Sequence, residues 1–222
     1  MASVTAAIFR VNPIEVRNRL EELGWTVEEL IEIVGTMVSA RHSCTDNDPT
    51  CAPGWMAWKD GSRRLREIGR AKGLQKSEID QIPCVVDVDR KLRFSVSNTD
   101  DGTSLAPPRI PQNCSKKGPG TDRVVTSNQG SLFDYLDAPM KVVPLSMAKP
   151  QPGILVSWFL CTYCAGDEIR AELSCPIGVH GGFFTDFLER LVLIGPDDDG
   201  GAGIRRILPD DGPEFEIPVT RK

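Results

Sequence analysis

The chain of 222 residues carries a formal net charge of −5 at pH 7, and 40% of its residues are hydrophobic while 26% are charged. This is the composition of an ordinary globular protein with enough residues to bury a core. The densest apolar run, at 154–160, is too short to cross a bilayer, and the acidic balance excludes a general polyanion binder.

The first ten residues, MASVTAAIFR, place no lysine or arginine before their apolar residues, so we expect no secretory signal. Seven cysteines at irregular spacing favour reduced thiols over a disulfide framework. Together these features predict a cytoplasmic protein without membrane association.

Two helices are predicted near the N-terminus. Asn12 followed by Pro13 is typical of a helix start, and Gly24 is typical of a helix end. Thr26 and Glu29 form a capping-box pattern, which opens a second helix that runs to about residue 41. Its apolar stripe consists of Leu30, Val34, Met37 and Val38.

A third helix is predicted over 55–72, after a loop rich in turn-forming residues at 41–54. At about 100° per residue, one face of this helix becomes a basic stripe, formed by Lys59, Arg63, Arg66 and Arg70. The opposite, apolar face contains Trp58, Gly61, Leu65 and Ile68. The basic stripe either contacts an anionic partner or is a solvated face on which Glu67 pairs with the arginines.

Later in the chain the periodicity changes to that of strands. The runs "CVVDV" and "KLRFSV" predict one hairpin, and residues 153–163 with 167–175 predict a second. Helices are expected at 121–136 and at 183–194, although the end of the latter also fits a strand. The acidic turn "PDDDGGAG" precedes two expected short strands.

This order of elements predicts an α+β fold, in which N-terminal helices precede a mainly antiparallel sheet with one or two further helices. A helical part at 1–80 and a mixed part at 81–222 form either two units or one continuous domain. Residues 59–123 carry 14 Lys and Arg against 9 Asp and Glu, a net charge of +5, whereas both flanking parts are acidic. A single positive surface is therefore compatible with the acidic total.

A long loop at 99–120 is the second basic feature of the chain, and a loop of this length is usually functional or disordered. The side chains that could neutralise phosphate here are Arg109, Lys116, Lys117 and Arg123. Gln112, Asn113 and Ser115 offer neutral hydrogen-bonding groups, and Gly118 with Thr121 would expose backbone amides at a helix start. The alternative is a flexible, solvated connection.

The cysteines near the second hairpin have the spacing of a metal knuckle. Cys161 and Cys164 precede a turn glycine, and Cys175 with His180 would complete a tetrahedral site for zinc. Strand parity argues against this site, because Cys175 continues an apolar face formed by Ile169, Ala171 and Leu173. We therefore expect a β-turn with buried thiols, no metal and no cofactor.

An acidic group near the first hairpin offers a catalytic alternative. Asp80, Asp87, Asp89 and Lys91 could hold Mg²⁺ and position a water for phosphodiester cleavage, as in metal-dependent nucleases. Asp89 and Lys91 flank the expected turn, however, so the same residues fit a charged turn without catalysis. Because GxSxG, P-loop and dinucleotide motifs are missing, we favour a non-catalytic protein.

Two stretches resemble segments of uncharacterised bacterial and phage-encoded proteins: "ARHSCTDNDPTCAPGWMAWKDGSRRLRE" at 40–67, and "PQNCSKKGPGTDRVV" with "NQGSLFD" at 111–134. The resemblance implies a cytosolic protein from a mobile element or a host–phage conflict locus, and it carries no known catalytic residue.

The basic loop and the basic stripe together predict a binding protein for nucleic acid or another phosphate-bearing ligand. In this hypothesis the basic side chains neutralise phosphates, and Gln112 and Asn113 read base edges. The main alternative is a protein–protein interaction module, in which the acidic parts face a basic partner and the loop orders on binding.

Overall fold

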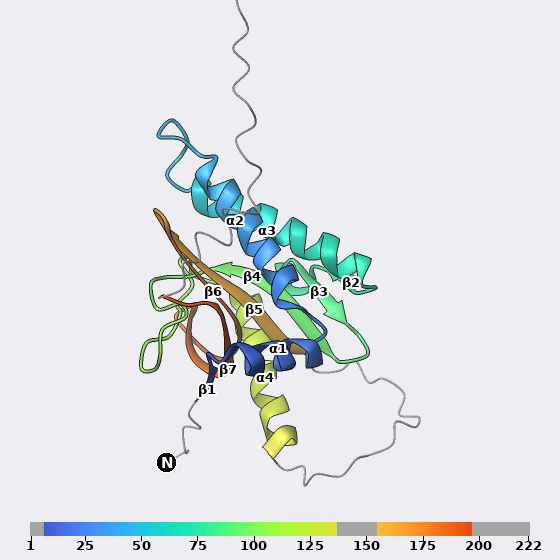
Figure 1. Ribbon diagram of the computed structural model, residues 1–222. Coiled ribbons are helices and arrows are strands. Elements are labelled where there is room, and N and C mark those ends of the chain that lie inside the picture. Colours follow the sequence, from blue (N-terminus) through green and yellow to red (C-terminus); the bar gives the residue numbers. More distant parts are fainter. Residues whose placement is uncertain (1–6, 137–154, 197–222) are drawn as a thin grey trace, which may run out of the picture.

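The computed structural model describes residues 7–136 and 155–196 (Figure 1). Its strands form a seven-stranded sheet in the order β1-β7-β6-β5-β4-β3-β2. Their bounds are β1 (Ile8–Arg10), β2 (Gln75–Ser77), β3 (Cys84–Asp87), β4 (Leu92–Asn98), β5 (Val156–Ala165), β6 (Glu168–His180) and β7 (Phe183–Ile194). The pairs β1–β7 and β4–β5 are parallel and the other four are antiparallel, which confirms the predicted α+β class.

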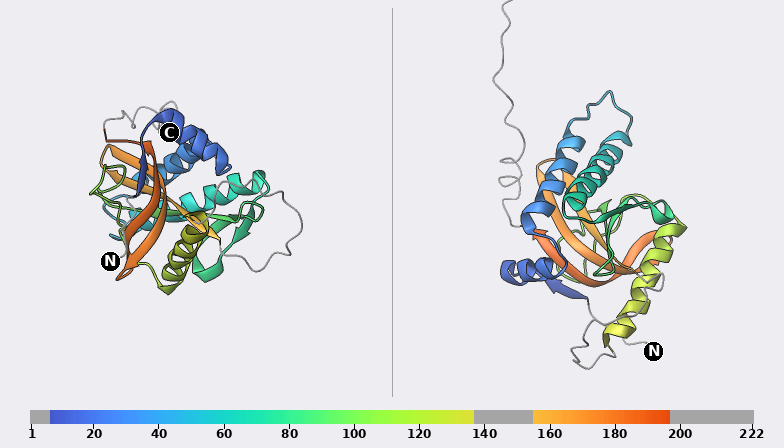
Figure 2. Two further views of the ribbon diagram at one scale, coloured as in Figure 1. Left: turned by 90° about the horizontal axis from the view of Figure 1, so that it is seen from below. Right: turned by 90° about the vertical axis from the view of Figure 1, so that its right-hand side faces the viewer.

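Helices cover both faces of the sheet (Figure 1 and Figure 2). α1 (Pro13–Glu22), α2 (Val27–His42) and α3 (Ala52–Ala71) pack on one face, and α4 (Pro119–Leu136) packs on the other. Because side chains alternate along β5, Trp158 and Leu160 join the core beneath α1–α3, whereas Phe159 and Cys161 join the core beneath α4. The described chain is therefore built in three layers.

The predicted helix starts are confirmed. The Asn12 side chain accepts a hydrogen bond of 2.9 Å from the Ile14 amide, and Pro13 occupies the first turn of α1. Thr26 and Glu29 form the reciprocal capping box of α2. Both are contacts between near neighbours in the chain, which explains why the local sequence was sufficient to predict them.

The helix expected at 183–194 is wrong, because this segment is strand β7. Its apolar residues serve two cores: Phe184 and Phe187 pack beneath α4, while Leu191 and Ile194 pack beneath α1–α3. Register shifts between β6 and β7 break the alternation of the strand, and the resulting spacing mimics that of a helix. The turn and strands expected after residue 196 lie outside the described residues.

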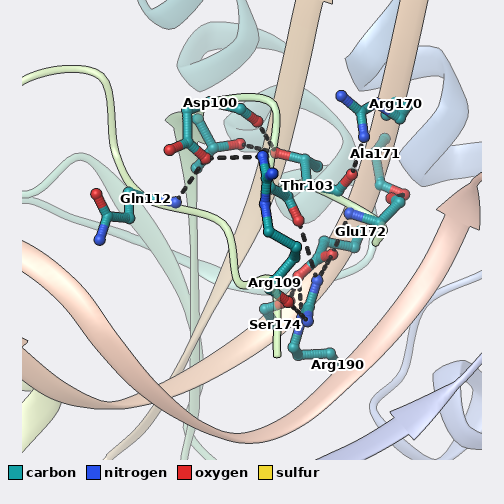
Figure 3. A network of polar contacts seen from close by, with 12 residues as sticks. Asp100, Thr103, Arg109, Gln112, Arg170, Ala171, Glu172, Ser174 and Arg190 are labelled. Carbon is teal, nitrogen blue, oxygen red and sulfur yellow. Dashed lines mark hydrogen bonds and ion pairs between the residues drawn. The ribbon is translucent and has the colours of Figure 1, made fainter. Parts of the chain in front are cut away.

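The long loop after β4 is tied to the sheet by a buried ion pair (Figure 3). Arg190 on β7 and Glu172 on β6 are both fully buried, and their closest contact joins Nη2 to Oε2 at 2.7 Å. Arg190 also donates to the Arg109 carbonyl at 2.9 Å, and Glu172 accepts from the Ser104 amide at 2.6 Å. Two strands thus hold two points of the loop.

Asp100 and Asn113 close the ends of the same loop. The Asp100 carboxylate accepts from the Gly102 and Gln112 amides at 3.0 and 2.9 Å, which folds the loop back on itself (Figure 3). The Asn113 amide donates to the Gly182 carbonyl and accepts from the Phe184 amide. Asn113 therefore fixes the start of the following segment, which contains Lys116 and Lys117, beside the β6–β7 turn.

Candidate functional site

A cleft of about 1130 Å³ opens between the first turns of α3, the short 3-10 turn η1 (Ile79–Gln81) and residues 114–121. Its floor includes Val96 from β4 and Phe159 from β5. Sequence-distant segments therefore meet in one concave site, which we call the basic cleft.

Lys116 and Lys117 form one wall of the basic cleft. The Lys117 amide donates to the Gly182 carbonyl at 2.9 Å, so the turn between β6 and β7 fixes the backbone of both lysines. Lys116 is exposed and Lys117 is part-buried, and neither has an ion pair with an acidic side chain among residues 7–136 and 155–196. Burial lowers the pKa of Lys117, an effect that the neighbouring Cys161 and Cys114 oppose. A negatively charged ligand would remove this penalty.

Arg123 forms another wall, together with η1. Its Nε donates to Asp80 Oδ1 at 3.0 Å, so its charge is largely matched. Asp80 and Gln81 both have positive φ angles, near 60°, which is unusual for residues other than glycine. This turn packs against the start of α4 at Gly120, where an added Cβ would lie 2.3 Å from the Asp80 carbonyl oxygen.

Trp55 supplies an aromatic surface at the mouth of the basic cleft. It lies in the first turns of α3 and is 54% exposed, with Lys59 Nζ 5.5 Å from its ring centre. The Asn98 side chain donates to the Gly54 carbonyl at 2.7 Å, which holds this end of α3 against β4. An exposed indole in a positive cleft is suited to stack on a flat ring.

Sequence reasoning missed two cleft residues, Trp55 and Arg41. Arg41 lines the basic cleft from the end of α2 and has no acidic ion-pair partner in the part of the chain that the structure describes. The spacing of Trp55 and Lys59, four residues apart on one helix, was a usable signal for an aromatic–cation pair. No sequence signal indicated that the end of α2 reaches the cleft.

The basic stripe of α3 lines an adjoining hollow of about 500 Å³. Trp58, Glu78 and Pro83 line both this hollow and the basic cleft, so the two predicted basic features adjoin. The stripe is partly neutralised within the protein, because Lys59 contacts Asp60 at 3.3 Å, Arg63 contacts Glu67 at 3.8 Å and Arg66 contacts Glu78 at 3.0 Å. Arg70 is exposed on the same hollow.

Several predicted ligand-binding residues serve the loop instead. Asn113 is 2% exposed and its amide is used in backbone contacts, so it cannot read a base edge. Arg109 pairs with Asp101 at 2.8 Å, and neither it nor Gln112 lines the basic cleft. Ser115, Gly118 and Thr121 do line it. The Thr121 amide donates to the Gly118 carbonyl, which leaves it unavailable to a phosphate.

The proposed zinc ligands are not brought together. Cys161 is buried beneath α4, whereas Cys175 is buried beneath α1–α3, on the opposite face of the sheet. Cys164 is part-buried and His180 is exposed at the far end of β6. Within residues 7–136 and 155–196, no three His, Cys, Asp or Glu side chains are placed to hold a metal ion. The predicted apolar face of β6, Ile169, Ala171, Leu173 and Cys175, is confirmed.

The nuclease residues are also dispersed. Asp87 is buried in the β3–β4 turn, where Oδ1 accepts from the Arg90 amide at 2.9 Å and Oδ2 contacts the Arg90 guanidinium at 2.7 Å. Asp89 and Lys91 are exposed in that turn, and Asp80 lies in the basic cleft. These four residues therefore do not form a metal site, and the charged-turn interpretation fits the geometry.

Comparison with family models, with curated proteins and with solved structures gave no match. The resemblance to bacterial and phage-encoded proteins therefore stays a prediction. No helix within the described residues is long and apolar enough to cross a membrane.

Proposed function

We propose that this protein binds single-stranded nucleic acid along the basic cleft, without catalysis. One observation carries the proposal: three cations and an exposed aromatic ring line the same cleft. The cations are Arg41, Lys116 and Lys117, which have no acidic ion-pair partner among the described residues, and the ring is that of Trp55. The cations would neutralise phosphates, and the ring would stack on an unpaired base.

A single strand fits this arrangement better than a duplex. A base can lie flat on an exposed indole only when it is free of its own neighbours, as in an unpaired strand. The basic stripe of α3 would extend the contact beyond the cleft. We place this activity in the cytoplasm, where the seven free cysteines would remain reduced.

Fluorescence anisotropy with labelled oligo(dT), oligo(U) and a DNA duplex at several salt concentrations tests the proposal. We expect saturable binding of the single strands. A plot of log K against the logarithm of the salt concentration should have a slope of about −2, since roughly three phosphates are neutralised. Lys116→Ala/Lys117→Ala should remove most of the affinity, and Trp55→Ala should weaken it at unchanged salt slope.

Arg17→Gln/Lys91→Asn is the matched control, because it removes two positive charges from exposed positions outside the cleft. Asparagine tolerates the positive φ of Lys91. Equal losses in the control and the double-lysine variant would show a non-specific charge effect. Absence of binding at low salt would reject the proposal and favour a protein partner.

A further inference from the structure

The hollow beside the basic cleft, which we call the α3 hollow, has a surplus of positive charge. α3 forms one wall, and β2 with the segment that leads to β3 forms the other (Figure 1). Five cations line the hollow, four from the basic stripe and Lys76 from β2, against two carboxylates, Glu67 and Glu78. Asp60 pairs with two cations of the stripe and adds a third negative charge. Five positive charges against three negative ones leave a net charge of +2.

The surplus charge lies on Arg70 and Lys76. Neither side chain has an ion pair or a hydrogen bond within residues 7–136 and 155–196. The other three cations of the stripe each have a carboxylate partner. Arg70 extends from the last turn of α3 and Lys76 from β2, so the two unpaired charges line the hollow from different elements. A neutral ligand would leave both charges unmatched, whereas an anion would neutralise them.

Buried hydrogen-bond donors follow the same face of α3. Ser62, Arg66 and Arg70 are four residues apart, which places them one above another along the hollow. The hydroxyl of Ser62, a residue that is 5% exposed, has no hydrogen-bond partner among the described residues. The Nε of Arg66 has none there either, although its Nη2 donates to the Ser77 carbonyl at 2.9 Å. Ligand oxygens in the hollow would supply the missing acceptors.

The charge of the α3 hollow favours the end of a strand over its interior. Trp58, Glu78 and Pro83 line both the hollow and the basic cleft, so a strand in the cleft can reach the hollow. An internal phosphodiester carries one negative charge, whereas a terminal phosphate monoester carries about −1.5 to −2 at pH 7 and has three acceptor oxygens. The monoester therefore matches the surplus of +2, and the diester leaves half of it unmatched.

We propose that the α3 hollow binds a terminal phosphate monoester of the single strand that lies in the basic cleft. This inference rests on the proposed function, and it adds a preference for phosphorylated strand ends. Arg70 and Lys76 neutralise the monoester from two elements, and the Ser62 hydroxyl donates to one of its oxygens. A 5′-phosphate and a 3′-phosphate present the same group to the hollow, so the experiment has to distinguish them.

Fluorescence anisotropy with three internally labelled oligo(dT) strands of equal length tests this inference on the whole chain. One strand carries a 5′-phosphate, one carries a 3′-phosphate, and one has hydroxyl groups at both ends. We expect a phosphorylated strand to bind about tenfold more tightly than the hydroxyl strand, because charge-assisted hydrogen bonds are added. The strand that gains affinity identifies the end that occupies the hollow.

Arg70→Gln/Lys76→Gln removes the two unpaired charges and should bind the three strands with equal affinity. Ser62→Ala should reduce the preference for the phosphorylated strand without a change of charge. Arg17→Gln/Lys91→Asn is again the matched control, since both positions are exposed and lie outside the hollow, and it should keep the preference.

Two results would overturn this inference and leave the proposed function intact. One is equal affinity of the unchanged chain for phosphorylated and hydroxyl strands, and the other is a preference that survives Arg70→Gln/Lys76→Gln. An equal loss of preference in the control would also overturn it, because the preference would then reflect total charge. If no strand binds at all, the proposed function fails and this inference fails with it.

Discussion

Position 120 has no room for a side chain, because η1 packs against the start of α4 there. A Cβ added to Gly120 would lie 2.3 Å from the Asp80 carbonyl oxygen. We predict that Gly120→Ala lowers the free energy of unfolding by about 1–3 kcal/mol, as expected for overpacking against backbone. Urea denaturation measures this change. Gly118→Ala is the control, since nothing lies within 4 Å of its Cβ position, and it should leave stability nearly unchanged.

The buried carboxylate of Asp87 should make the free energy of unfolding depend on pH. Burial alone would raise its pKa, but hydrogen bonds from the Arg90 amide and guanidinium, with the Arg90 charge, hold the pKa below its ordinary value. The contribution of Asp87 to stability is therefore complete above the ordinary carboxyl pKa and is lost as the pH falls through the lowered folded value.

Asp87→Asn keeps an acceptor for the Arg90 amide and removes the charge. We expect the variant to be less stable at neutral pH and to lose less stability on acidification than the unchanged chain. Urea midpoints at neutral pH and near pH 3 check this, and parallel curves for the two proteins would contradict it. Asp89→Asn, exposed in the same turn, should have no such effect.

The residues of the basic cleft differ in how well the local sequence predicts them. The sequence predicts Lys116 and Lys117 because both lysines directly precede Gly118 and an expected helix start, where an anion could approach the backbone. Asn113 was misassigned, because its residue type does not reveal that its amide bonds to the β6–β7 turn. Trp55 and Arg41 were missed, because their exposure depends on how α2 and α3 end beside the loop, a tertiary property.

Among the elements, strands β6 and β7 hold the long loop at 99–120 in place through the buried ion pair of Glu172 and Arg190. Glu172→Ala leaves a fully buried guanidinium without its carboxylate, so we predict a loss of about 3–5 kcal/mol. Hydrogen exchange should also show faster exchange at the Ser104 amide, which loses its acceptor. Glu172→Met/Arg190→Met, which removes both charges, should cost less. A double variant as unstable as the single one would contradict this explanation.

The elements that the sequence predicts correctly are those with local determinants. Capping residues define the starts of α1 and α2, alternation defines β4 and the apolar face of β6, and the turn after "CVVDV" places β3 in a hairpin with β4. The error at β7 has a physical origin: a strand with cores on both faces and irregular pairing has no period of two. Alternation on β6 also could not reveal that Glu172 is buried, since its partner Arg190 comes from another strand.

For the whole molecule, thiol reactivity gives a test of the described fold. Cys84, Cys161 and Cys175 are fully buried, and burial raises the pKa of each thiol. We expect these three to resist a thiol reagent until the chain unfolds, whereas exposed Cys51 reacts first. Counting modified cysteines by mass spectrometry checks this. Rapid modification of more than four of the seven would contradict the described packing.

The parallel pairing of β1 with β7 determines when this edge of the sheet forms. Arg10 on β1 meets Glu189 on β7 from the other end of the described chain, so during synthesis this edge stays open until β7 has left the ribosome. A cavity of about 470 Å³ between α1, β1 and β7 therefore exists only after this edge has closed. A molecule that filled it would act on the final assembly step alone, and would slow the reopening of that edge without speeding the earlier steps of folding.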